Sequence, residues 1–164
     1  RDSLHRLYLD DSIPKLARRR VLEASVRATE DWHRDAIQAA YSSGDRDWIL
    51  TAVFAMRWVR GFDAEILEAL KSADFDIHCE AVEAAGNWEL AAAWPHVLAL
   101  VNKPRTPKRL LLAAIGAVGS IRPAEAGPVL VELTDSLDEE IAEAANDAMM
   151  MAEAAAGPDD EEED

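Results

Sequence analysis

Residues 77–86 read Ile-His-Cys-Glu-Ala-Val-Glu-Ala-Ala-Gly, and this stretch decides the fold. Its first, fifth and eighth residues are Ile77, Ala81 and Ala84, a spacing that places all three on one face of an α-helix. Two of these three side chains are alanine, so a neighbouring helix can approach this face closely. The stretch therefore predicts a helix that buries a narrow stripe of small side chains.

The same pattern recurs along the chain in five segments, which begin at Ala17, Trp48, Ile77, Leu110 and Ile141. The fifth residues of these segments are Val21, Ala52, Ala81, Ala114 and Ala145. The eighth residues are Ala24, Ala55, Ala84, Ala117 and Ala148, and the twelfth are Ala28, Val59, Trp88, Ile121 and Ala152. Recurrence at a spacing of about 30 residues is the sequence signature of a repeat protein. We expect each segment to bury the same face.

A second set of apolar positions lies between these segments and predicts another helix in each unit. It comprises Ile37, Ile66, Val97 and Val129, followed four residues later by Tyr41, Leu70, Val101 and Leu133. Gly44 and Gly61 stand where helices can end in the left-handed conformation. Ser136 and Glu139 have the spacing of a capping box. Each unit is therefore predicted to be helix, turn, helix.

The stretch at residues 77–86 resembles the second helix of a HEAT repeat, in the short form also found in phycobilisome lyases, whose pattern is V-R-x-x-A-x-x-A-L-G. Residues 141–150 fit this pattern except at the last position, and residues 110–119 fit it less closely. The resemblance covers residues 13–153. It implies a right-handed superhelical stack in which the second helices line the concave side.

We therefore predict an all-α protein, a right-handed α-solenoid of four to five HEAT-like repeats spanning residues 1–156. Only a short segment before Ala17 is left for the first helix of the first unit, so we expect further repeats upstream in a longer native protein. Residues 157–164 begin with Gly-Pro and end in six consecutive acids. Such a block of like charge buries nothing, and we expect a disordered acidic tail.

The charge balance argues against some classes of partner. The chain carries 17 basic and 32 acidic residues, for a net charge of −15, which repels phosphate backbones. No apolar run approaches the roughly 18 residues of a membrane span. We therefore expect neither nucleic acid nor a membrane as partner. Cys79, the single cysteine, excludes an internal disulfide and favours a reducing, cytoplasmic location.

One helix face in the second unit predicts a binding surface. It reads Leu50, Phe54 and Trp58, at intervals of four residues, with Arg57 beside them. We expect this face, opposite the alanine stripe, to be exposed, and exposed aromatic residues beside arginine are typical of interface hot spots. The alternative is that the stripe packs into the core. His78 and Leu112 extend the predicted surface into the neighbouring units.

The remaining tryptophans fall near predicted helix ends, where we expect them to fill gaps between units: Trp32, Trp48, Trp88 and Trp94.

Enzymatic alternatives rest on relatives of the fold. The HEAT-like deoxyhypusine hydroxylases bind iron through His-Glu pairs, and none of the four histidines here is followed by glutamate. HEAT-like DNA glycosylases need a basic concave face, which the net charge opposes. A lyase-like activity is implied by the resemblance alone.

We therefore predict no catalytic residues, no metal and no cofactor, and a scaffold that binds another protein on its concave face. The alternative is a purely structural spacer or a regulatory domain of a larger protein. A basic loop at residues 103–109 is a further candidate for an acidic partner or the chain's own tail, although such loops are often simply solvated.

Overall fold

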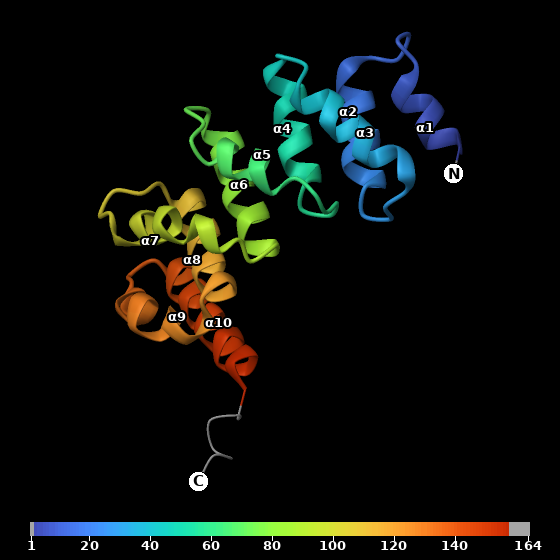
Figure 1. Ribbon diagram of the computed structural model, residues 1–164. Helices are drawn as coiled ribbons and strands as arrows, with labels where there is room; N and C mark the ends of the chain where they lie inside the picture. Colours follow the sequence, from blue (N-terminus) through green and yellow to red (C-terminus); the bar gives the residue numbers. More distant parts are fainter. Residues whose placement is uncertain (1, 158–164) are drawn as a thin grey trace. The chain divides into compact units, whose positions relative to one another are not determined.

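The structure, a computed structural model, describes residues 2–157, and the predicted acidic tail at residues 158–164 lies outside them. The described residues form ten α-helices, two short 3-10 helices and no β-strand (Figure 1). The α-helices are α1 (Asp2–Leu9), α2 (Lys15–Ser25), α3 (Asp31–Tyr41), α4 (Arg46–Ala55), α5 (Asp63–Ala69), α6 (Phe75–Asn87), α7 (Trp94–Asn102), α8 (Lys108–Ile121), α9 (Pro123–Leu130) and α10 (Glu139–Ala156). The 3-10 helices are η1 (Ala91–Ala93) and η2 (Val131–Asp135). The predicted all-helical class is confirmed.

The chain divides into two compact units, Arg1–Ala84 and Ala85–Asp164, with the boundary inside α6. In the first unit, α2 packs against α1 and α4, and α3 packs against α4. In the second unit, α8 packs against α7, α9 and α10, and α9 also packs against α10 (Figure 1). The five aligned segments begin within α2, α4, α6, α8 and α10, which are called the second helices below, and α3, α5, α7 and α9 lie between them in the sequence.

The predicted stripe of small residues is buried in four of the five segments. Its fifth and eighth positions are almost completely inaccessible there: Ala52, Ala55, Ala81, Ala84, Ala114, Ala117, Ala145 and Ala148. The prediction is wrong for α2, where Ala24 is exposed and the buried residues are Arg19, Leu22 and Val26. In α10 this face lies on the preceding second helix, α8, whereas α2 is the first helix of its kind among the described residues. Its burial therefore follows its contacts with α1 and α4.

Two glycines let helices of the second unit approach closely. A Cβ atom placed on Gly86 would lie 3.0 Å from Ala117 Cα, and one placed on Gly119 would lie 3.1 Å from the Ala148 carbonyl oxygen. These distances are tighter than nine in ten real Cβ contacts, so a larger side chain at either position would force the neighbouring helix to shift. An alanine of α8 thus fits against a glycine of α6, and an alanine of α10 fits against a glycine of α8.

Aspartate side chains cap the first turn of several second helices. The same side chains also form ion pairs with the second helix that precedes each of them. The Asp45 carboxylate accepts from the backbone N–H groups of Asp47 and Trp48, and the Asp138 carboxylate accepts from those of Glu140 and Ile141. The predicted capping box of α10 is therefore corrected, because Asp138 caps the helix and Ser136 Oγ accepts from the Asp138 N–H at 3.2 Å. A carboxylate at this position neutralises part of the helix dipole and satisfies N–H groups that lack helical partners.

Each of these caps is held by a cation from the first turn of the preceding second helix. The pairs are Lys15 with Asp45 (3.2 Å) and Asp47 (2.9 Å), Arg46 with Asp74 and Asp76 (both 2.6 Å), and Lys108 with Asp138 (3.0 Å) and Glu140 (2.9 Å). The hydrogen bond from Trp48 N–H and the Lys15 ammonium lower the pKa of Asp45, and Lys108 lowers the pKa of Asp138. Because these groups are exposed, each pair adds little stability and chiefly fixes the register of neighbouring helix starts.

Aromatic side chains join α1 to the rest of the first unit. The Tyr8 hydroxyl donates to the Ala36 carbonyl at 3.4 Å, and Arg18 Nε donates to the Tyr8 carbonyl at 2.7 Å. Trp32 stacks on His5 with ring centroids 4.6 Å apart, and Trp48 meets the Tyr8 ring edge-on at 5.8 Å. Trp32 and Trp48 thus fill space between helices, as the sequence predicted.

His33 at the start of α3 is completely buried and uncharged. Its Nδ1 accepts from the Glu30 backbone N–H at 2.8 Å, so the ring proton resides on Nε2, 2.9 Å from Ser25 Oγ. Burial lowers the pKa of His33 below its ordinary value, because a charged ring would lose its hydration.

The glycine packing predicts opposite effects of the same substitution at two sites in α8. Gly119→Leu should lower the free energy of unfolding by at least about 1–3 kcal/mol, because the side chain meets the α10 backbone. Gly116→Leu is the matched control. A Cβ atom there meets nothing within 4 Å, so better helix propensity should leave stability unchanged or raise it by about 1 kcal/mol. Urea unfolding followed by circular dichroism measures both, and equal effects would contradict this packing.

His33 predicts a loss of stability in mild acid. Since its pKa is lower in the folded chain, the unfolded chain binds more protons below about pH 6.5. Its contribution is fully present above about pH 6.5 and is lost as the pH falls towards the folded pKa. His33→Gln should flatten the dependence of the free energy of unfolding on pH between about 7.5 and 5. His96, whose pKa burial also lowers, remains as a background in both proteins. An unchanged slope in the variant would refute the assignment.

Candidate functional site

The candidate surface begins on α4, whose start is fixed by Gly44 and Asp45. Gly44 adopts φ 75°, a left-handed conformation that favours glycine, but it lies in the turn beyond Ser42, the residue that caps the end of α3. From Asp45, α4 runs to Ala55, and the chain then continues through a turn in which Trp58 N–H donates to the Ala55 carbonyl at 3.0 Å. The sequence placed Trp58 on the same helix as Leu50. Instead, Arg57 and Trp58 lie in the turn just beyond it.

Phe54 and Trp58 form an aromatic pair at this end of α4. Their ring centroids lie 4.9 Å apart at an interplanar angle of 51°. Leu50, Phe54 and Trp58 are each half-buried, so the predicted stripe is neither fully exposed nor fully in the core. A half-buried aromatic pair keeps one side supported by the protein while the other remains available for contact.

Two guanidinium groups lie over these rings. Arg57 Cζ is 4.9 Å from the centroid of Trp58 and 5.9 Å from that of Phe54, and Arg27 Cζ is 5.1 Å from that of Trp58. These distances fall within the range of cation–π attraction. The arginines therefore hold the tryptophan ring in one orientation and lend the surface a positive edge.

Carboxylates of α6 accompany Arg57 on its other side. Its guanidinium lies 3.8 Å from a Glu80 oxygen and 3.9 Å from a Glu83 oxygen. Arg57 is 31% exposed, so solvent screens these long ion pairs and they contribute little to stability. These ion pairs restrict the conformation of the Arg57 side chain and keep its guanidinium group over the rings.

A buried polar network ties α2 to α4. Arg19 Nε donates to Thr51 Oγ1 at 2.8 Å, and the Thr51 hydroxyl donates to Glu23 Oε2 at 2.8 Å. Thr51 is 0% and Arg19 9% exposed. Arg19 is therefore turned towards α4, where Thr51 Oγ1 accepts the hydrogen bond from its Nε–H group.

The other two residues of the predicted surface lie on different helices. His78 is half-buried on α6 in the same compact unit as α4, whereas Leu112 is half-buried on α8 in the second unit. The structure therefore brings together Leu50, Phe54, Arg57 and Trp58, and it places Leu112 in a separate unit.

Several residues of the site were not identified from the sequence. Arg27, Thr51, Glu80 and Glu83 contribute to it through contacts between different helices. One signal was available, because Arg27 and Trp58 occupy the same position in consecutive segments. Equal positions in neighbouring helices of a stack lie side by side.

Comparison with known proteins identifies no relative of this chain: no protein-family model matches its sequence, and no curated protein shows significant similarity. Among residues 2–157, no group of three His, Cys, Asp or Glu side chains is arranged to hold a metal ion. No helix in that part of the chain is long and apolar enough to cross a membrane.

The buried network predicts a specific cost for removing one hydroxyl. Thr51→Val keeps the side-chain shape but leaves Arg19 Nε without its acceptor, and should lower the free energy of unfolding by about 1–3 kcal/mol. Adding Arg19→Met removes the donor as well and should restore part of the loss. Urea unfolding of the wild type, both single variants and the double variant gives the coupling energy. Strictly additive losses would show that the network does not link the two residues.

Proposed function

We propose that this chain is a protein-interaction scaffold, a right-handed HEAT-like α-solenoid that binds another protein through the surface around Phe54 and Trp58. The solenoid is supported by the recurrence of the five segments and by their buried alanine positions. It is further supported by the aspartate caps that link successive second helices. The proposed role is non-catalytic, and the buried thiol of Cys79 suits a cytoplasmic location.

The observation that carries the proposal is the half-exposed pair of Phe54 and Trp58 with Arg27 and Arg57 over the rings. Tryptophan and arginine are the residues most enriched in interface hot spots. Here both are held by intramolecular contacts before any partner arrives, so little side-chain entropy remains to be lost on binding. Leu50 adds an apolar margin one helical turn away, and His78 extends the proposed surface along α6.

The partner surface that fits this site has an apolar side chain for the aromatic pair and an acceptor for the arginines. Because Arg57 already lies near Glu80 and Glu83, a partner carboxylate would compete with them, whereas a backbone carbonyl or an amide would not. We therefore propose an uncharged, apolar contact at the centre.

The proposal predicts that truncating the aromatic pair abolishes partner capture without unfolding the chain. A Phe54→Ala, Trp58→Ala double variant should lose at least about 2 kcal/mol of binding free energy, roughly 30-fold in affinity. Affinity capture from the native cell extract, with mass spectrometry of the retained proteins, compares it with the wild type. Leu16→Ala is the matched control, because Leu16 is 54% exposed on α2 in the same unit.

Direct contact is tested by a photoreactive phenylalanine analogue at position 54, which should crosslink to the captured partner, whereas the same analogue at position 16 should not. Circular dichroism and urea unfolding establish that each variant folds. Retention of the same partner by the folded double variant would place the interface elsewhere. Capture of nothing by the wild type would favour a structural spacer.

A further inference from the structure

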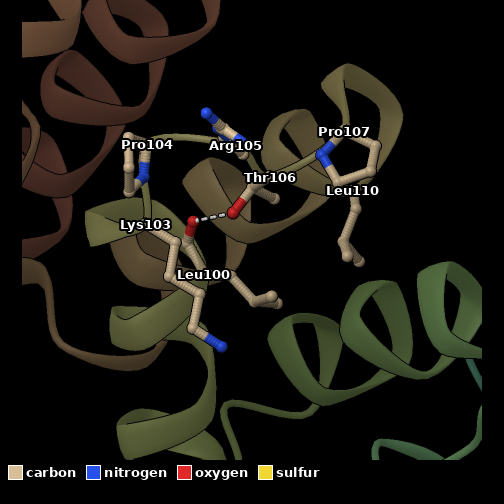
Figure 2. A pocket seen from close by; sticks show the side chains of 7 residues that line it. All are labelled: Leu100, Lys103, Pro104, Arg105, Thr106, Pro107 and Leu110. Atoms are coloured by element: carbon tan, nitrogen blue, oxygen red, sulfur yellow. Dashed lines mark hydrogen bonds between the residues drawn. The ribbon is translucent and has the colours of Figure 1, made fainter.

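The loop between α7 and α8 forms an open groove in the second unit. Its residues are distant in the sequence from those of the Phe54–Trp58 surface. Its volume is about 400 Å³, and it is lined by Leu100, Lys103, Pro104, Arg105, Thr106, Pro107 and Leu110 (Figure 2). Leu100 and Leu110 are buried and supply apolar walls, while the lysine, the arginine and both prolines are exposed. A space of this size has room for one or two large apolar side chains of a bound peptide.

The loop that forms the groove is held in one conformation. The Thr106 hydroxyl donates to the Leu100 carbonyl at 2.6 Å (Figure 2). The Lys103 N–H donates to the Ala99 carbonyl at 3.0 Å. Pro104 and Pro107 fix two further backbone angles. The groove is therefore preorganised, and binding would need little ordering of the loop.

Three basic side chains lie in or next to the groove, and they differ in whether they already form ion pairs. Lys108, at the start of α8, is paired with Asp138 and Glu140. Lys103 and Arg105 form no ion pair with any carboxylate of residues 2–157. Lys103 extends to the same side of the loop as Leu100 and Leu110, whereas Arg105 projects from the opposite side (Figure 2). One unpaired ammonium group therefore stands beside the apolar walls.

This arrangement discriminates between classes of anionic ligand. A phosphate group is normally held by several donors that converge on one point. Here Lys103 and Arg105 diverge, and the Thr106 hydroxyl is committed to Leu100. A single ammonium group beside an apolar groove instead suits one carboxylate next to an apolar side chain.

We propose that this groove binds an acidic peptide segment of another protein, with a large apolar side chain between Leu100 and Leu110 and a neighbouring carboxylate on Lys103. The apolar side chain supplies the affinity, and the carboxylate fixes the direction of the peptide. Arg105 attracts flanking acidic residues over a longer range.

The test uses the full-length chain and a fluorescein-labelled peptide of sequence Asp-Glu-Leu-Phe-Glu-Asp, followed by fluorescence anisotropy. The peptide should bind saturably, and Lys103→Glu should weaken it at least about 10-fold. Lys71→Glu is the matched control: Lys71 is exposed, lies in the first unit and changes the net charge equally, so the affinity should be unchanged. Arg105→Glu should have a smaller effect than Lys103→Glu.

Two control peptides separate the groove from general charge attraction. Replacement of Leu-Phe by Ser-Ser should abolish binding if the apolar walls are used, and replacement of the acids by Asn and Gln should weaken it. The proposal would be overturned if the Ser-Ser peptide bound as tightly as the Leu-Phe peptide. It would also be overturned if the Leu-Phe peptide bound the Lys103→Glu variant as tightly as it binds the wild-type chain. Absence of any binding by the Leu-Phe peptide at millimolar concentration would overturn it as well.

A spectroscopic signal locates the bound carboxylate. Burial and the nearby Lys103 ammonium lower the pKa of His96 on α7. A carboxylate on Lys103 should raise the His96 pKa, measured by NMR titration of its imidazole, in the wild type but not in Lys103→Glu. Deletion of residues 158–164 should leave the affinity unchanged. A tightening of at least about 10-fold would identify the chain's own acidic tail as the occupant and overturn the assignment to another protein.

Discussion

The close approach of small residues between helices is the constraint on which the rest of this structure depends. Gly119 faces Ala148 and Gly86 faces Ala117 across distances at which an added Cβ atom would make a contact tighter than nine in ten real ones. The alanines at equivalent positions of α4 and α6 are likewise buried. Close packing makes neighbouring backbones almost touch, so a small displacement is not easily absorbed and the helices hold their surface side chains in fixed positions.

The ion pairs at the helix starts fix the register of neighbouring helices and contribute little stability. The cations Lys15, Arg46 and Lys108 each contact the carboxylates that begin the next second helix. These contacts are exposed and individually weak, but they occur at equivalent positions and satisfy helix ends at the same time. The buried bond from Arg19 to Thr51 differs, because an unpaired donor inside the protein would cost far more than the bond contributes.

The two proposed contact surfaces follow different physical principles. Around Trp58, aromatic rings and guanidinium groups are already in mutual contact, so recognition would rest on shape and apolar area. In the groove at Leu100 and Leu110, the apolar walls stand beside the Lys103 ammonium group, which forms no ion pair with a carboxylate of residues 2–157, so recognition would rest on a mixed acidic and apolar segment.

The sequence by itself determined the helix class, the positions of the second helices and the burial of their alanines, because helical periodicity and small side chains act locally. It also identified Phe54 and Trp58 as a potential surface. Only the tertiary structure decided that this pair is half-buried, that Arg19 turns inward to Thr51, and that Ala24 stays exposed. Each of these outcomes depends on which helix lies beside the residue. Periodicity within one helix shows which residues share a face, but not which neighbour covers that face.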